Sequence, residues 1–277
     1  MQFIMLFNAI DCNLIVINLF LIEHESDLCY NIAVRKKRGD FLKNKIRVII
    51  SISVLIIILS SFFIYTGNFY HADVSALQSL QTSQSVRVVK TDFGWLFDGP
   101  SDENALIFYP GAKVEETAYA PMLNLLAEKG VDVCLVKMPF RLSFFGINKA
   151  ADIISEYGYS DFYIGGHSLG GAMAAVYAAK HSENLSGVIL FAAYPTKPID
   201  EKLSLMSIYG DKDGVLNMKK LEEGMQYIPG SYSECEIEGG NHAQFGNYGV
   251  QKGDGTALVS AEEQQRSAVE FIIENIH

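Results

Sequence analysis

The chain has 277 residues, of which 49% are hydrophobic and 19% charged, and its formal net charge is −10 at pH 7. This length and apolar content allow one sizeable buried core, and they exclude a disordered chain and a disulfide-dense scaffold. The four cysteines, Cys12, Cys29, Cys134 and Cys235, are widely spaced, without the close pairs that zinc or dithiol redox chemistry needs. We therefore expect no metal site.

The charges are unevenly distributed along the chain. Residues 35–47 contain seven lysines and arginines and a single aspartate, whereas residues 71–277 carry 27 acidic and 15 basic side chains. The bulk of the protein is therefore acidic, and it lacks the basic surface that binds phosphate backbones. Nucleic acid is not expected as a partner.

The N-terminal part of the chain contains a candidate membrane span. Residues 1–34 form an extension of uncertain role, which is apolar but interrupted by asparagines and an aspartate. The basic cluster and the predicted transmembrane anchor occupy residues 35–66. Within this range, residues 48–65 form an uncharged run, which as a helix would extend about 27 Å and nearly match the hydrocarbon core.

The basic cluster also predicts the orientation of this span. Because positive residues stay on the cytoplasmic side, everything after Tyr65 should lie outside the cytoplasm, on a single-pass protein of the cell membrane. The alternative is a cleaved signal peptide, whose apolar region would be about 7–15 residues long and would end near small cleavage residues. We favour the retained anchor. Residues 67–85, rich in serine and glutamine, are expected to form a short tether.

From Val86 onward, short apolar runs alternate with amphipathic stretches, and we expect one domain over residues 86–277. The expected strands, bounded by Gly, Pro, Asp and Asn, are 86–91, 94–99, 105–110, 131–138, 161–166, 186–194, 203–210 and 232–240. The expected helices are 116–129, 148–157, 170–181, 218–227 and 261–276. This order predicts an α/β fold with a mostly parallel central sheet and helices on both faces. Ligands of such sheets bind at the carboxyl ends of the strands.

The strand at 161–166 is followed by one serine among glycines. Gly166, His167, Ser168, Leu169 and Gly170 fit Gly-x-Ser-x-Gly, which is typical of a nucleophile elbow. A sharp elbow holds its serine in strained backbone geometry, and side chains two residues away would collide with the neighbouring strand or helix. Ser168 is therefore the predicted nucleophile, and the positive N-terminal end of the next helix points at any oxyanion that forms.

A serine nucleophile needs a base that is oriented by a carboxylate. In this fold the order along the chain is Ser, then Asp or Glu, then His, each after a later strand. His242 follows the strand at 232–240 and is the predicted base. Asp211 and Asp213 both follow the strand that ends at Gly210. We favour Asp213 as the acid, because it has the usual offset in this fold, whereas Asp211 suits a turn or helix cap.

The negative oxygen of the transition state needs hydrogen-bond donors. One is expected to be the backbone N–H of Leu169, directly after the nucleophile. The other should come from the loop after the strand at 105–110, where Ala112 is preferred and Lys113 is the alternative. Aromatic residues near these motifs are expected to be core residues rather than pocket walls; they are Tyr119, Phe144, Phe145 and Phe245.

The chain from about Val86 to its end resembles the α/β-hydrolases. The segments that carry the resemblance are YPGAKVEETAYAPMLNLLAEKG, GGHSLGGAMAA, YGDKDGV and GGNHAQFGNYG, which together are similar to a bacterial group of small α/β-hydrolases often described only by fold. The resemblance implies Ser168, Asp213 and His242 as a catalytic triad, with no cofactor. Pro110 stands where better-known lipases often have a histidine, so the oxyanion loop departs from theirs.

These features predict a serine hydrolase that acts on small esters, with the membrane as a second partner through the N-terminal helix. No cap domain is expected, because only PTKPIDEK separates the strands at 186–194 and 203–210. An open, shallow site favours short acyl chains, since a long chain gains little from methylenes that stay exposed. An envelope acyltransferase that uses the same acyl-enzyme is the alternative function. A non-catalytic binding module is the third hypothesis.

Overall fold

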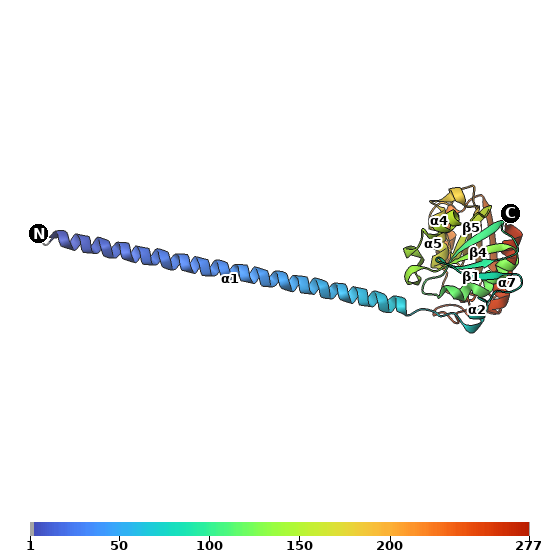
Figure 1. The fold of residues 1–277 in the computed structure, drawn as a ribbon, viewed down its shortest axis with the longest axis horizontal. Helices are drawn as coiled ribbons and strands as arrows, with labels where there is room; N and C mark the ends of the chain where they lie inside the picture. The colour runs from blue at the N-terminus through green and yellow to red at the C-terminus, as the bar shows by residue number, and fades with distance from the viewer. Residues whose placement is uncertain (1–2, 277) are drawn as a thin grey trace. The chain divides into compact units, whose positions relative to one another are not determined.

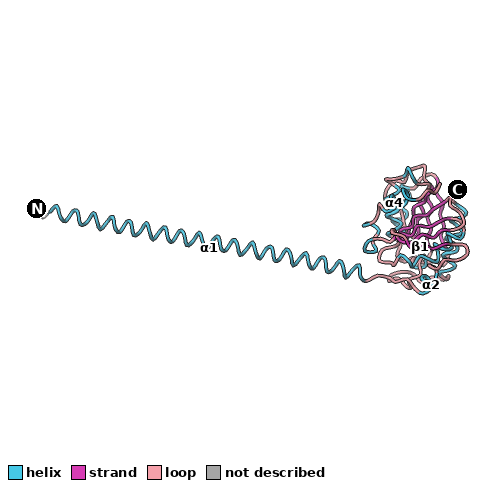
Figure 2. Tube along the Cα trace, in the orientation of Figure 1, coloured by secondary structure: helices cyan, strands magenta, loops and turns pink. Residues whose placement is uncertain are grey.

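The structure, a computed structural model, describes residues 3–276, with the side chains of residues 3–29, 39 and 40 outside that description. It divides into two compact units, Met1–Tyr65 and Thr66–His277. Figure 2 shows the first unit as a single helix and the second as a mixture of strands, helices and loops.

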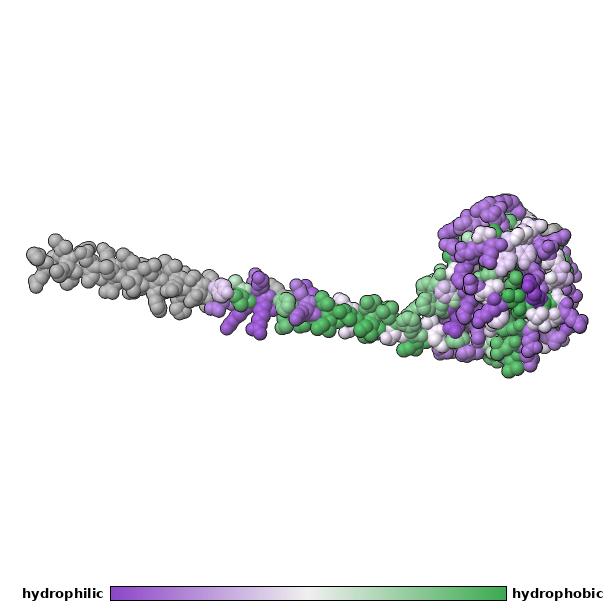
Figure 3. Space-filling model, viewed as in Figure 1, coloured by the Kyte–Doolittle hydropathy of each residue, from purple (hydrophilic) through white to green (hydrophobic). Residues whose placement is uncertain are grey.

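The first unit belongs to one long helix, α1 (Phe3–Gly67). Its part Tyr30–Gly67 is long and apolar enough to cross a membrane, and none of its apolar window is buried. Figure 3 shows a hydrophilic stretch of α1 followed by a hydrophobic one, as the basic cluster and the uncharged run predict. A helix that is apolar on every side needs apolar surroundings. The sequence predicts an extension of uncertain role for residues 1–34. Most of its side chains lie outside the described ones, so this stays a prediction.

The second unit is built on one eight-stranded sheet (Figure 1). The strands are β1 (Arg87–Lys90), β2 (Gly94–Asp98), β3 (Asn104–Tyr109), β4 (Val131–Val136), β5 (Asp161–His167), β6 (Gly187–Phe191), β7 (Ser204–Gly210) and β8 (Ser231–Ile237). Their order is β1-β2-β4-β3-β5-β6-β7-β8. β2 is antiparallel to β1 and β4, and every other pair is parallel. The predicted fold class is therefore confirmed.

Helices cover both faces of the sheet. They are α3 (Ala120–Glu128), α4 (Lys149–Glu156), α5 (Leu169–Ala178), α6 (Met218–Gly224) and α7 (Ala261–Asn275). Successive strand residues point to opposite faces, so Leu106 and Phe108 of β3 pack with α3 and α7, whereas Ile107 packs with α4 and α5. Figure 1 accordingly shows α7 on the opposite side of the strands from α4 and α5. All five expected helices are present.

No cap domain interrupts the sheet between β6 and β7. Residues 192–203, all of which the structure describes, contain no helix or strand. The loop after β4 is also short, with two single-turn helices, η2 (Pro139–Arg141) and η3 (Ser143–Phe145). The carboxyl edge of the sheet therefore has no inserted domain over it at either connection.

Residues 67–85 differ from the expected tether, because part of this segment packs on the domain. Tyr70 pairs with the loop after β3: its N–H donates to the carbonyl oxygen of Lys113 over 2.7 Å. The short helix α2 (Val74–Gln78) follows, and its Ala76 is fully buried. The serine and glutamine content could not indicate this packing, because backbone hydrogen bonds and the side chains of Tyr70, Ala72, Ala76 and Leu80 carry it.

We predict that Ala76→Glu releases this segment from the domain, because an unpaired carboxylate is costly at a fully buried position. Chymotrypsin should then cleave the full chain between residues 66 and 85 at least about tenfold faster, since local opening controls cleavage. Val74→Glu, at a position 71% exposed in the same helix, is the control and should stay resistant. Equal cleavage of the two variants and the parent would mean that the segment is a free tether.

Candidate active site

Ser168 lies at the sharp turn between β5 and α5, at the carboxyl edge of the sheet. Its backbone has φ 54° and ψ −122°, which is strained for a residue with a side chain. The turn is held on both sides: Ser168 N–H donates to the carbonyl oxygen of Phe191 over 2.9 Å, and its own carbonyl accepts from Ala172 N–H over 3.0 Å. Neighbouring backbone therefore fixes the strained conformation and leaves the serine side chain half-buried at the pocket.

Glycines beside Ser168 allow α5 to approach the sheet closely. A Cβ on Gly166 or on Gly170 would overlap the carbonyl oxygen of Tyr109, the last residue of β3. A Cβ on Gly171 would overlap the carbonyl oxygen of Gly166. The collision predicted from the sequence is thus present on both sides of the serine, and any side chain here would push α5 away from β3 and β5.

His242 and Asp213 form a buried hydrogen-bonded pair beyond β8 and β7. His242 Nδ1 lies 2.7 Å from Asp213 Oδ2, and each side chain is 1% exposed. The other oxygen, Oδ1, accepts the N–H groups of Val215 and Leu216 over 2.8 and 2.7 Å. Asp213 therefore forms the Asx-turn that was expected of Asp211, and these bonds fix the direction of its carboxylate.

His242 lines the same pocket as Ser168, and its second ring nitrogen is not engaged by the described residues. A carboxylate oxygen can only accept, so we assign the ring proton to Nδ1, which leaves Nε2 as an acceptor. Nε2 is buried and has no hydrogen-bond partner among the described residues. Ser168 and His242 line the same pocket, of about 230 Å³. The structure therefore places Ser168 and His242 at one pocket and Asp213 against the imidazole ring.

Asp211, the other aspartate of this loop, makes a different set of contacts. Its Oδ2 lies 2.7 Å from Lys212 Nζ, and its Oδ1 accepts Gly239 N–H over 2.6 Å. The hydrogen bond from Lys212 lowers the pKa of the Asp211 carboxyl. Asp211 therefore joins the ends of β7 and β8, and the structure places Asp213, not Asp211, against the imidazole.

The loop after β3 contains one N–H group that is not engaged. Gly111 N–H donates to Tyr119 Oη over 3.1 Å, and Lys113 N–H donates to the carbonyl oxygen of Arg141 over 2.9 Å. Ala112 N–H makes no hydrogen bond within the described residues. This arrangement favours Ala112 over Lys113 as the donor predicted from this loop.

The N-terminus of α5 carries the other predicted donor. Leu169 is the first residue of α5, so its N–H has no carbonyl one turn earlier in the helix. It makes no hydrogen bond in the part of the chain that the structure describes. Leu169 lines the pocket with Ser168, whereas Ala112 is not among the lining residues.

A buried hydrogen-bond chain lies behind the loop after β3. Tyr119 Oη accepts from Gly111 N–H and lies 2.8 Å from His167 Nδ1, and both side chains are buried. The direction of the bond between Oη and Nδ1 depends on the tautomer of His167. A Cβ on Gly111 would lie 2.8 Å from both Oη and Nδ1, so this close approach requires glycine. Tyr119 is buried, as expected of a core residue, but its polar contact was not predicted from the sequence.

His167 connects this chain to the candidate base. The ring centroids of His167 and His242 lie 4.4 Å apart. Burial, together with the neighbouring His242, lowers the pKa of His167 well below its ordinary value. His167 therefore stays neutral, and His242 does not face a second positive charge when it accepts a proton.

Asp254 is a further residue that sequence reasoning missed. Its Oδ1 accepts the N–H groups of Gly214 and His242 over 3.1 and 3.2 Å, and its Oδ2 accepts Ala243 N–H over 2.8 Å. One carboxylate thus holds the loop of the candidate acid against the loop of the candidate base. The available signal was an aspartate between two glycines in the distinctive segment after His242.

The pocket beside Ser168 is small. Besides Ser168 and His242, its walls are mainly small or apolar side chains, from Leu169, Ala172, Ala192, Ala193, Tyr194, Val215, Leu216 and Asn217. Pockets for drug-sized ligands measure about 300–1,000 Å³, whereas this one measures about 230 Å³. Its size and composition suit a short apolar group attached to the reacting carbonyl.

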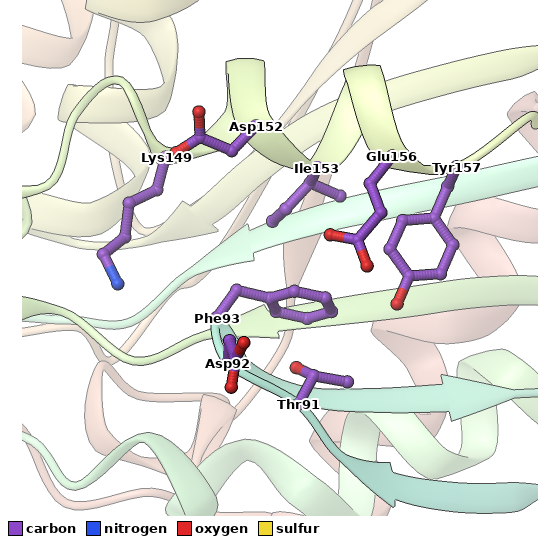
Figure 4. Close-up of a pocket in the computed structure, with 8 residues that line it drawn as sticks. All are labelled: Thr91, Asp92, Phe93, Lys149, Asp152, Ile153, Glu156 and Tyr157. Carbon is purple, nitrogen blue, oxygen red and sulfur yellow. The ribbon is translucent and has the colours of Figure 1, made fainter.

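A larger cavity, of about 460 Å³, lies between the β1–β2 turn and α4, and none of the predicted site residues lines it. Figure 4 shows Asp152 and Glu156 of α4 on one side and Asp92 of the turn on the other. Its lining residues include three carboxylates and one lysine but no serine, cysteine or histidine. Nucleophilic chemistry is therefore assigned to the smaller pocket.

Metal-ligating residues do not gather in the described part of the chain. No group of three or more His, Cys, Asp or Glu side chains there could hold a metal ion. Cys134 and Cys235 are free thiols, the first buried in β4 and the second half-buried in β8, while Cys12 and Cys29 lie outside the described side chains. The expectations of no metal and no cofactor remain predictions.

The aromatic residues named from the sequence divide into two pairs. Tyr119 and Phe245 are fully buried, as expected of core residues. Phe144 and Phe145 are 48% and 47% exposed, so the expectation that they belong to the core is wrong. They lie in η3, a single turn at the surface before α4 that leaves their rings about half exposed.

We predict that Tyr119→Phe lowers kcat about tenfold and leaves KM within about twofold. In this variant Gly111 N–H loses its acceptor, and the loop that directs Ala112 N–H toward the proposed oxyanion becomes less rigid. Steady-state kinetics with a chromogenic short-chain ester measure both constants. Tyr248→Phe, which removes the hydroxyl of a neighbouring buried ring, is the control. A rise in KM with unchanged kcat would contradict a role in the transition state.

Solved structures of other proteins are similar to this chain. A monoacylglycerol lipase from Paleococcus ferrophilus matches with a TM-score of 0.52 at 13% identity, over 70% of this chain and 100% of its own. Est1E from Butyrivibrio proteoclasticus matches with a TM-score of 0.48 at 14% identity, over 69% and 99%. Esterase 2 from Thermogutta terrifontis, phosphoramylated by tabun, matches with a TM-score of 0.47 at 15% identity, over 70% and 96%. At 13% identity, the match to the Paleococcus ferrophilus lipase shows the fold alone.

The sequence comparisons identify the family. No curated protein matches the chain in sequence. The profile of the alpha/beta hydrolase family matches residues 105–266, which is more than half of the chain. The match begins in β3 and extends into α7, so it includes Ser168, Asp213 and His242. The chain therefore belongs to the alpha/beta hydrolase family.

Proposed function

We propose that this protein is a serine hydrolase that cleaves small esters through an acyl-enzyme intermediate. Ser168 is the nucleophile, His242 the base and Asp213 the acid that orients it. The observation that carries the proposal is the buried 2.7 Å contact between His242 Nδ1 and Asp213 Oδ2, which leaves Nε2 unpartnered at the pocket of Ser168. This is the arrangement that activates a serine hydroxyl.

The first half of the reaction acylates the serine. Ser168 Oγ attacks the ester carbonyl carbon, and His242 Nε2 takes the proton of the hydroxyl. Asp213 stabilises the imidazolium, and the N–H groups of Leu169 and Ala112 donate to the developing oxyanion. When the tetrahedral intermediate collapses, the carbon–oxygen bond to the alcohol breaks, and the alcohol leaves with the proton from Nε2.

The second half regenerates the enzyme. A water molecule, deprotonated by His242, attacks the acyl carbon, and the bond to Ser168 Oγ breaks as the serine recovers its proton. The product is a carboxylic acid. An alcohol that replaced water would give acyl transfer, the alternative expected from the sequence, and analysis of the products in water with and without an added alcohol separates the two outcomes.

The substrate is proposed to be small because of the pocket and the connections around it. The pocket of about 230 Å³ is lined near Ser168 by three alanines, and Val215 and Leu216 form part of its wall. The connection between β6 and β7 contains no helix or strand that could cover a long acyl chain. A methylene contributes about 0.8 kcal/mol only when it is buried, so a chain that extends past this pocket gains little.

We also propose that α1 anchors the enzyme in the cell membrane as a single pass, with the hydrolase domain outside the cytoplasm. The described part of α1 is long and apolar enough to span the membrane. The seven basic residues before the uncharged run support this orientation, since positive residues stay on the cytoplasmic side.

Substitution of the triad tests the chemistry. Ser168→Ala and His242→Ala should each lower kcat/KM by at least about 10⁴-fold, because the members act as a unit. Asp213→Asn should cost about 10³–10⁴-fold, since it disturbs the tautomer and charge of the imidazole pair. Asp211→Asn, in the same loop but bonded to Lys212, is the control and should stay within about threefold. A severe Asp211→Asn with a mild Asp213→Asn would mean that the acid is Asp211.

A series of esters with graded acyl length tests the substrate class. We predict that kcat/KM peaks at short acyl groups of roughly two to six carbons and shows no jump at the solubility limit of the ester. Leu216→Ala, which opens the pocket wall, should move the peak to longer chains. A rise that continues to long acyl chains in the parent enzyme would exclude the proposed preference for small esters.

A further inference from the structure

An exposed aromatic cluster lies outside the active site, in residues 139–145, which we name the aromatic loop. Phe140, Phe144 and Phe145 are 44%, 48% and 47% exposed. The ring centroids of Phe140 and Phe145 lie 5.4 Å apart, and those of Phe144 and Phe145 lie 4.3 Å apart. The three rings therefore form one contiguous apolar patch, which is a feature of surfaces that bind a partner or a membrane.

The fold holds this loop in a defined conformation. Phe140 and Arg141 have φ 53° and 57°, so two successive residues with long side chains occupy the left-handed region. Two hydrogen bonds of 2.9 Å fix the loop to the loop after β3: Lys113 N–H donates to the carbonyl oxygen of Arg141, and Ser143 Oγ donates to that of Pro110. The outward position of the rings is therefore imposed by the surrounding structure.

The aromatic loop contacts the segment that follows α1. The Arg141 guanidinium carbon lies 3.4 Å from the ring centroid of Phe69, two residues after the last residue of α1, Gly67. An extended chain covers at most about 3.6 Å per residue, so Phe69 lies within about 14 Å of Tyr65, which ends the uncharged run. A membrane around that run would have its surface within reach of the aromatic loop.

The charge of this region also differs from that of the domain. Residues 137–149 contain Lys137, Arg141 and Lys149 and no acidic residue, whereas residues 71–277 have a net charge of −12. Lys137 is paired with Glu116, with 3.6 Å between Nζ and Oε1. Exposed phenylalanine rings bury into the boundary between headgroups and acyl chains, and basic side chains bind anionic headgroups. The composition therefore fits a lipid surface.

We propose that the aromatic loop inserts its rings into the surface of the same membrane that α1 spans, on the side of the hydrolase domain. This inference rests on the proposed anchoring by α1 and is independent of the proposed catalysis. Because the anchor keeps the loop close to the bilayer, even a weak contact is populated through its high effective concentration. The loop follows β4 at the carboxyl edge of the sheet, so its contact turns the edge that carries Ser168 toward the membrane surface.

Quenching of tryptophan fluorescence by lipids with brominated acyl chains tests the proposal. The full chain is reconstituted into vesicles of phosphatidylcholine and phosphatidylglycerol in a 3:1 ratio, roughly the anionic content that attracts basic segments. Trp95, the one tryptophan of the chain, is replaced by phenylalanine in every variant. Phe144→Trp places the reporter in the loop. Asn184→Trp, in the exposed turn before β6 at the opposite edge of the sheet, is the matched control.

The tryptophan of Phe144→Trp should lose at least about twofold more emission to brominated lipid than that of Asn184→Trp, and its emission should lie at shorter wavelength. Phe145→Trp gives a second reporter in the same cluster, so the result does not depend on one variant folding. Equal quenching of the loop reporters and the control overturns the proposal. If the full chain fails to float with the vesicles, the anchor and this proposal both fail, while hydrolysis by Ser168 is measured separately with soluble esters.

Discussion

The close contact between α5 and the carboxyl end of β3 is the constraint on which the rest of the site depends. Gly166 and Gly170 leave no Cβ between the helix and the carbonyl oxygen of Tyr109. The same approach holds Ser168 at φ 54° and brings the start of α5 next to the loop that contains Ala112. One packing interaction thus sets the position of Ser168, the proposed nucleophile, and of both unengaged N–H groups, which would otherwise need separate support.

The proposed base, His242, and the proposed acid, Asp213, depend on a second contact, between the ends of β7 and β8. A Cβ on Gly210 would overlap the backbone of Gly240. Glycine at this position therefore allows the loops that follow β7 and β8 to lie close together. Asp254 then holds Gly214 and His242 through a single carboxylate. The two halves of the site meet at His167, whose buried neutral ring contacts both Tyr119 and His242.

Much of the fold was predictable, because it depends on local patterns. Apolar runs bounded by glycine and charged residues marked all eight strands, and the Gly-x-Ser-x-Gly turn located Ser168 in the chain. The choice of Asp213 followed from its offset after Gly210, and the structure places it against His242. These predictions used residues within a few positions of each other, where spacing carries the information.

The remainder depends on contacts between distant parts of the chain. Tyr119 and His167 are 48 residues apart, and neither side chain indicates by itself that the two are hydrogen-bonded. Tyr70 packs through its backbone and through its ring, which contacts Tyr248 in a distant part of the chain, so local composition suggested a tether. Phe144 and Phe145 read as core residues because hydrophobicity does not distinguish a buried ring from one exposed on a strained loop. The residues that support the site were therefore less predictable than the proposed catalytic residues.

Covalent labelling with a fluorophosphonate, followed by mass spectrometry of the peptides, tests the central claim most directly. The probe reacts with a serine only when a base activates the hydroxyl and donors stabilise the oxyanion-like transition state. The proposed mechanism predicts one adduct per chain, on Ser168, with labelling that slows strongly in His242→Ala. A folded parent chain that stays unlabelled, or an adduct on another residue, would contradict the assignment of Ser168 as the nucleophile.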